Sequence, residues 1–125
     1  MAKTRQPQKR IMIADDDEDL VFVLSRQMEQ AGYKVFTCTG GINLLDDLHK
    51  HSPALLLLDI AMRTLNGSEL CRDIKNDPAL NGTRILLMSG NHNIAEHAAS
   101  CGADGYVAKP LSLAELKSIV SKYLE

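Results

Sequence analysis

The hydrophobic residues of this chain fall into five short runs, which longer amphipathic segments separate. The runs are RIMIA, KVFTC, ALLLLD, RILLMS and GYVA, at residues 10–14, 34–38, 54–59, 84–89 and 105–108. They lack polar–apolar alternation, as is typical of strands that are buried on both faces of a parallel sheet. The pattern therefore predicts five parallel strands.

The segments between these runs have the length and spacing of amphipathic helices. Gly32 follows the first of them, where a left-handed residue is favoured, and SLAE at residues 112–115 has the spacing of a capping box. We predict helices over residues 19–31, 42–51, 68–76, 94–100 and 113–124.

Five strands alternating with five helices predict a doubly wound α/β fold with three αβα layers. If the second and third strands lie on opposite sides of the first, the strand order is 2-1-3-4-5, that of the flavodoxin-like class. Ligands of such sheets bind beyond the carboxyl ends of the strands, at the switch between the first and third strands. We therefore expect the functional residues at this edge.

Polar residues follow four of the predicted strands. The first strand ends in the acidic run 15–17, the third in Asp59, the fourth in Ser89 and the fifth in Lys109. Each feature alone is typical of a cap, a turn or a solvated surface, but the strand order brings all four to one crevice. Asp59 closes a run of leucines, so its charge needs a partner, and Lys109 could supply it.

These side chains together indicate magnesium and phosphoryl chemistry. Clustered carboxylates repel one another and attract a cation, and hard oxygen ligands favour Mg²⁺. Asp59 would be a carboxylate nucleophile able to accept a phosphoryl group. Lys109 would neutralise charge on the transferred oxygens, and Ser89 would donate a hydrogen bond to them.

Composition adds limits to this interpretation. The length of 125 residues predicts a single domain, which we place at residues 10–125. A net charge of -2 gives no strong electrostatic field that would attract nucleic acids. Residues 1–9 are basic and lack apolar periodicity, so we expect a disordered leader. No run approaches the length that spans a membrane. The three cysteines match no metal or redox spacing and indicate reduced thiols in a cytoplasmic protein, and we expect all four histidines at the surface.

Two metal or nucleotide sites are excluded by spacing. A calcium loop that starts at Asp15 needs Gly and Glu where Leu20 and Arg26 stand, and the GxxxxGK[ST] motif is absent. Two alternatives stay open: a phosphatase with an aspartyl-phosphate intermediate, and a binding module that takes no phosphate. Ala61 argues against the first, because such hydrolases commonly place an acid–base Asp two residues after the nucleophile. The complete polar set argues against the second.

The motifs IMIADDDEDL, LLLLDIAM, NGSEL, LLMSG and GADGYVAKPLS resemble those of the receiver (phosphoacceptor) domain of two-component response regulators. The resemblance covers about residues 10–125 and extends to the single-domain chemotaxis and sporulation regulators. It implies a signalling domain, not a turnover enzyme beyond its own phosphoryl transfer and slow autodephosphorylation. The phosphodonor would be a histidine kinase or a histidine phosphotransfer protein.

The resemblance also implies a role for each site residue. By this resemblance Asp59 would be the phosphorylated residue. Mg²⁺, with Mn²⁺ as a possible substitute, would be held by Asp16 directly, by Asp15 largely through water, by Asp59 and by the backbone carbonyl of Ala61. The phosphate-binding and switch residues would be Ser89, Gly90, Lys109 and Tyr106, and the peptide bond before Pro110 would be cis.

Several positions depart from the family pattern. Arg63 replaces a common proline, Gly90 a common alanine, and Ala61 and Asn91 occupy positions that tune the lifetime of the phosphate. None of these changes removes a required group.

The resemblance places the output on the surface of the fourth helix, fifth strand and fifth helix, where an unknown downstream protein would bind. We expect neither nucleic-acid nor membrane contact in this chain. The segment NIAEHAASC lacks the basic residues that the transcription-factor branch uses for dimerisation, so we expect a monomer or weak dimer. The chain is either a stand-alone receiver or part of a larger regulator or hybrid kinase.

Overall fold

A computed structural model of the chain describes residues 8–39, 43–62, 66–90, 93–109 and 112–124. Five strands form one parallel sheet in the order β2-β1-β3-β4-β5, which confirms the predicted flavodoxin-like topology. The strands are β1 (Arg10–Ala14), β2 (Lys34–Cys38), β3 (Leu55–Asp59), β4 (Arg84–Ser89) and β5 (Gly105–Ala108). The expected leader largely precedes the described residues and stays a prediction.

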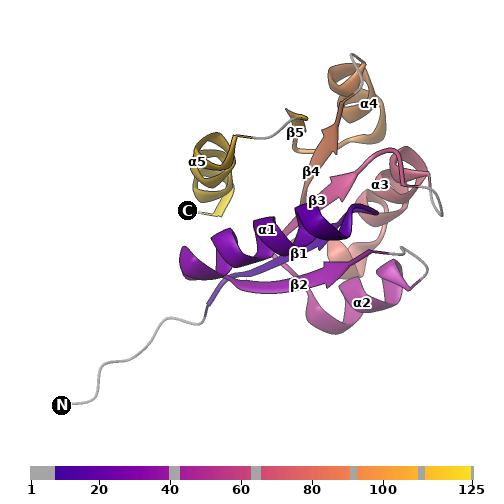
Figure 1. The fold of residues 1–125 in the computed structure, drawn as a ribbon. Coiled ribbons are helices and arrows are strands. Elements are labelled where there is room, and N and C mark those ends of the chain that lie inside the picture. Colours follow the sequence, from indigo (N-terminus) through magenta and orange to yellow (C-terminus); the bar gives the residue numbers. More distant parts are fainter. Residues whose placement is uncertain (1–7, 40–42, 63–65, 91–92, 110–111, 125) are drawn as a thin grey trace.

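Helices cover both faces of the sheet, so the three-layer prediction is also confirmed (Figure 1). They are α1 (Glu18–Gln30), α2 (Leu44–His51), α3 (Gly67–Lys75), α4 (Ile94–Cys101) and α5 (Leu113–Leu124). Each predicted helix end lies within two residues of the observed one. A short 3₁₀ turn, η1 (Pro78–Leu80), was not predicted. Among the described helices, none is long and apolar enough to cross a bilayer.

The unbroken leucine run of β3 is explained by two separate cores. Leu55 and Leu57 pack into the core beneath α1 and α5, whereas Leu56 and Leu58 pack into the core beneath α2, α3 and α4. All five residues of β3 are buried. Because successive side chains point to opposite faces of a sheet, a strand covered on both faces must be apolar throughout.

Hydrogen bonds and backbone conformation explain where several helices begin or end. The side chain of Asp17 accepts a hydrogen bond from the Leu20 N–H at 3.1 Å and caps α1, as expected for this residue type. Gly32 has a φ of 101°, which confirms the left-handed position predicted after the first helix. The Ser112 hydroxyl accepts a bond from the Glu115 N–H at 3.3 Å, one half of the predicted capping box.

An exposed contact between α2 and η1 gives the first testable prediction. His49 Nε2 lies 2.6 Å from Asp77 Oδ2, and this hydrogen bond, with a second from the Ala79 N–H, holds the pKa of Asp77 below its usual range. A depressed pKa means that the contact stabilises the fold above the ordinary Asp pKa and is lost as pH falls through the depressed value. We expect His49→Gln to raise the pKa of Asp77 toward the ordinary value, measured by NMR titration of its carboxyl carbon.

The matched control for this prediction is His51→Gln. The His51 ring stacks on Phe36, with centroids 3.8 Å apart, whereas the histidine bonded to Asp77 is His49. His51→Gln should leave the Asp77 titration unchanged, and equal curves for the two variants would contradict the assignment.

Candidate functional site

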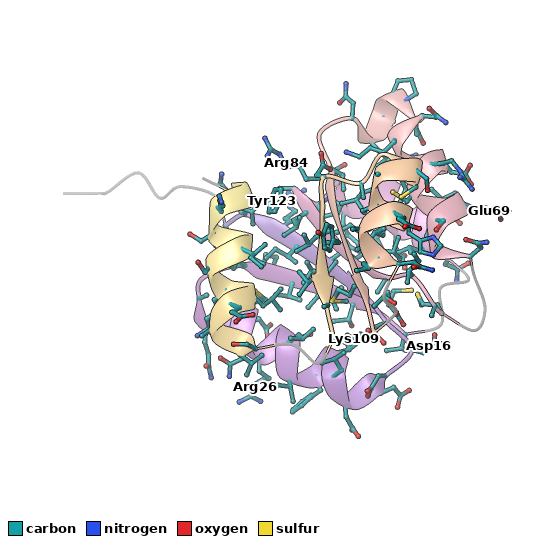
Figure 2. The ribbon with its side chains drawn as sticks, turned by 90° about the horizontal axis from the view of Figure 1, so that it is seen from above. Asp16, Arg26, Glu69, Arg84, Lys109 and Tyr123 are labelled. Atoms are coloured by element: carbon teal, nitrogen blue, oxygen red, sulfur yellow. The ribbon has the colours of Figure 1, made fainter. Side chains whose placement is uncertain are left out.

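The carboxyl ends of β1, β3 and β5 bring two carboxylates and one ammonium group together. Lys109 Nζ lies 2.7 Å from Asp15 Oδ2 and 3.7 Å from Asp59 Oδ1. Asp15 is 1% exposed and Asp59 is 7% exposed. In Figure 2, Asp16 and Lys109 lie at the same edge of the molecule. The charge of Asp59 is therefore largely buried and is partly compensated by a lysine, as the sequence led us to expect.

Lys109 has a different first partner from the one expected. Its shorter contact is with Asp15, and the longer one is with Asp59. The other oxygen of Asp15 accepts a hydrogen bond from the Asp17 N–H at 2.9 Å. Both Asp15 oxygens are thus engaged within the protein, whereas the ion pair to Asp59 is looser than a hydrogen bond.

The surroundings of Asp59 make its ionisation less favourable than that of a carboxyl group in water. Burial raises the pKa of the Asp59 carboxyl above its usual range, and the charge of Asp15 raises it further. A hydrogen bond from the Ala61 N–H, at 3.3 Å, and the charge of Lys109 act in the opposite direction without cancelling the effect. An added cation would therefore favour the ionised carboxylate.

The remaining expected residues lie around this pair. Ser89 is buried at the end of β4, and its carbonyl accepts a hydrogen bond from the Lys109 N–H at 2.8 Å. Gly90 follows it and is exposed. The side chain of Tyr106, on β5, is 49% exposed and thus turned toward solvent. Arg63, Asn91, His92 and Pro110 fall outside the described residues, so the expectations for them, the cis peptide included, are not tested.

The donor set fits a hard divalent cation by charge and chemistry. Asp15, Asp16 and Asp59 supply carboxylates, and the Lys109 ammonium contacts two of them, Asp15 and Asp59. Among the residues that the structure describes, no three His, Cys, Asp or Glu side chains are gathered as a ready metal cluster. A cation that keeps several waters and takes only one or two carboxylates does not need such a cluster.

Gly67 supports the site in a way that the sequence did not reveal. A Cβ atom on Gly67 would lie 2.7 Å from Ile60 Cα and 3.1 Å from the Asp59 carbonyl oxygen. The Gly67 N–H also donates to the Ile60 carbonyl at 3.3 Å. The first residue of α3 thus packs directly on the backbone that carries Asp59. The NGSEL motif contains this glycine, but spacing alone did not assign it a contact.

We expect Gly67→Ala to destabilise the domain by about 2 kcal/mol, because the backbone of residues 59–60 must move to admit the methyl group. Gly82→Ala is the matched control, since a Cβ there would meet nothing within 4 Å, and its effect should stay within about 0.5 kcal/mol. Urea denaturation measures both. Equal costs for the two variants would contradict the close packing at Gly67.

This chain belongs to the response regulator receiver domain family, whose model matches residues 11–121. It is thus a receiver domain of two-component signalling systems, with a flavodoxin-like fold and the acidic edge described above. The resemblance inferred from the motifs is confirmed.

Three relatives illustrate the similarity. Over 109 residues the chain is 33% identical to the response regulator MprA of Mycobacterium avium, covering 86% of this chain and 47% of MprA. It is 28% identical to the alkaline phosphatase synthesis transcriptional regulatory protein PhoP of Bacillus subtilis, covering 93% and 48%. The BeF3-activated DrrB receiver domain of Thermotoga maritima superimposes with a TM-score of 0.83 at 27% identity, covering 94% and 98%. The chain thus spans about half the length of the curated relatives.

Proposed function

We propose that this chain accepts a phosphoryl group on Asp59 from a histidine kinase or a histidine phosphotransfer protein, in a Mg²⁺-dependent reaction. The observation that carries the proposal is the position of Asp59. Its carboxylate closes a fully buried central strand and faces the ammonium of Lys109 at 3.7 Å. A carboxylate nucleophile beside a fixed cation is the arrangement that phosphoryl transfer to protein needs.

In the proposed step, an Asp59 oxygen forms a bond to phosphorus as the phosphorus–nitrogen bond of the donor phosphohistidine breaks. The imidazole leaves with the electron pair of that bond. Lys109 offsets the charge of the transferred oxygens and Ser89 donates a hydrogen bond to one of them. Asp15, Asp16, Asp59 and the Ala61 carbonyl would hold Mg²⁺, which supplies further charge neutralisation when bound.

The new phosphate adds about -1.5 to -2 charges beside Lys109 and Ser89. Attraction of these two groups pulls the loop after β4 inward, with Gly90 giving backbone freedom, and the outward-facing Tyr106 rotates into the space that is vacated. The surface of α4, β5 and α5 then changes for a downstream protein. A complete switch, from 1:99 to 99:1, requires about 5.5 kcal/mol of differential binding between the two states.

The proposed partners are proteins. A net charge of -2 offers no field for direct nucleic-acid binding, and we propose a monomer or weak dimer without membrane contact. The three cysteines, all of them within the described residues, form no disulfide, and two of them are buried, which supports a role in the reducing cytoplasm. Slow hydrolysis of the acyl phosphate would return the domain to its unphosphorylated state. We therefore propose a signalling domain that catalyses only its own phosphoryl transfer and dephosphorylation, and not an enzyme that acts on other substrates.

Incubation with Mg²⁺ and acetyl phosphate tests the proposal, with intact-mass spectrometry to count phosphoryl groups. We expect one phosphoryl group per chain. We expect none when Mg²⁺ is chelated before the donor is added. Continuous release of phosphate over many turnovers would show a phosphatase instead. The absence of any adduct would show a module that keeps the fold but takes no phosphate.

A further inference from the structure

A polar pocket lies between α3 and α4. It borders Ile60 and Ala61, which follow Asp59, and lies outside the cluster of Asp15, Asp59 and Lys109. Figure 1 shows these two helices side by side on one face of the sheet. The pocket has a volume of about 600 Å³, which is within the usual range of small-molecule sites. Its polar lining comes from Asn66, Ser68, Arg72, His97 and Ser100, and Ile60 and Ala61 form its apolar wall.

The lining is rich in hydrogen-bond donors and contains no carboxylate among its described residues, in a chain with 16 Asp and Glu residues. Arg72 carries a permanent charge and five N–H donors. The Asn66 side-chain oxygen is occupied by the N–H groups of Ser68 and Glu69, at 3.0 and 3.2 Å. The amide nitrogen of Asn66 is therefore the group left for a ligand.

Arg72 has no carboxylate partner among the described residues. Lys75, three residues further along α3, does have one. Lys75 pairs with Asp104 at 2.6 Å and so ties α3 to the start of β5. Ser68 Oγ lies 3.4 Å from His97 Nδ1 and links α3 to α4 across the pocket. The helices are thus held together by other contacts, and the fold does not use the charge of Arg72.

We propose that this pocket binds an organic anion, with Arg72 as the main contact of its carboxylate or phosphate group. Asn66 and Ser68 add hydrogen bonds, and the organic part of the ligand rests on Ile60 and Ala61. The volume exceeds what an inorganic anion fills, so an apolar group on the ligand strengthens binding. The site is distinct from the proposed phosphorylation site and does not depend on it, although the Ala61 N–H is bonded to Asp59.

Titration of ¹⁵N-labelled protein with phenyl phosphate, benzoate and inorganic phosphate, in EDTA to exclude metal, tests the proposal. We expect saturable amide shifts at Ser68, Arg72, His97 and Ser100, with both aromatic anions binding more tightly than inorganic phosphate. The ratio of the two aromatic affinities tells whether a phosphate or a carboxylate headgroup is preferred. Shifts centred on Asp15, Asp59 and Lys109, or shifts that never saturate, would overturn the proposal.

Matched charge variants separate the pocket from the overall field of the protein. Arg72→Gln should weaken phenyl phosphate binding about tenfold, the loss typical of one charge-assisted hydrogen bond. Arg26→Gln removes the same charge from α1, which Figure 2 shows far from α3, and should change the affinity less than about twofold. Both residues are exposed, so the spectra should show intact folds. Equal weakening in the two variants would refute the site.

Discussion

Replacing Asp59 with Asn should abolish phosphoryl labelling by acetyl phosphate and stabilise the fold at neutral pH. The carboxamide has the same shape but is a poor nucleophile, so the label should fall below detection. Burial and the charge of Asp15 raise the pKa of Asp59, which means that its ionised form is disfavoured in the folded state. Removing the charge should raise the free energy of unfolding by on the order of 1 kcal/mol at pH 7.5, which corresponds to a rise of about 4 °C in Tm.

The pH dependence of this gain has a definite sign. A group whose folded pKa is raised binds more protons in the folded state than in the unfolded state. The wild type therefore loses stability as pH rises from the ordinary Asp pKa through the raised value. The advantage of Asp59→Asn should be absent below the ordinary pKa and complete above the raised one, which thermal melts across this range will show.

Asp73→Asn is the matched control, since Asp73 is an exposed carboxylate on α3. It should be labelled as the wild type is and should melt at nearly the same temperature. Labelling of Asp59→Asn at the wild-type level would show that another residue accepts the phosphoryl group. A lower Tm for Asp59→Asn would show that the charge of Asp59 stabilises the fold.

The features predicted correctly from sequence are those that local patterns determine. The leucines at 55–58 indicated a strand covered on both faces, and Gly32 marked a helix end. The strand order then brought Asp15, Asp59 and Lys109 to one edge without any knowledge of side-chain geometry.

The features that were missed depend on how separate elements pack against one another. Gly67 comes close to Ile60 because the start of α3 packs on the backbone at the end of β3, and no local pattern encodes that packing. His97 was expected at the surface, but it is half-buried against Ser68 because α4 packs on α3. The preference of Lys109 for Asp15 over Asp59 is a difference of 1 Å between two contacts, which strand order cannot resolve.

Lys109→Met should cost about 2 kcal/mol of unfolding free energy at pH 7.5, because it leaves the buried carboxylates of Asp15 and Asp59 without their shared ammonium. Removing one partner of a fully buried pair costs more, but Lys109 keeps 24% of its side chain exposed, so solvent screens part of the loss. Urea denaturation measures the change. Lys117→Met, on the exposed side of α5, is the control and should cost less than about 0.5 kcal/mol.

The double variant Lys109→Met/Asp59→Asn tests the cause of that loss. If repulsion between Asp15 and Asp59 causes it, Asp59→Asn should recover more stability in the Lys109→Met background than the roughly 1 kcal/mol that it adds to the wild type, so the two changes are not additive. Millimolar Mg²⁺ should stabilise Lys109→Met more than the wild type, because the cation no longer competes with the ammonium for Asp15. Strictly additive effects, or a cost equal to that of Lys117→Met, would mean that Lys109 does not compensate the buried carboxylates.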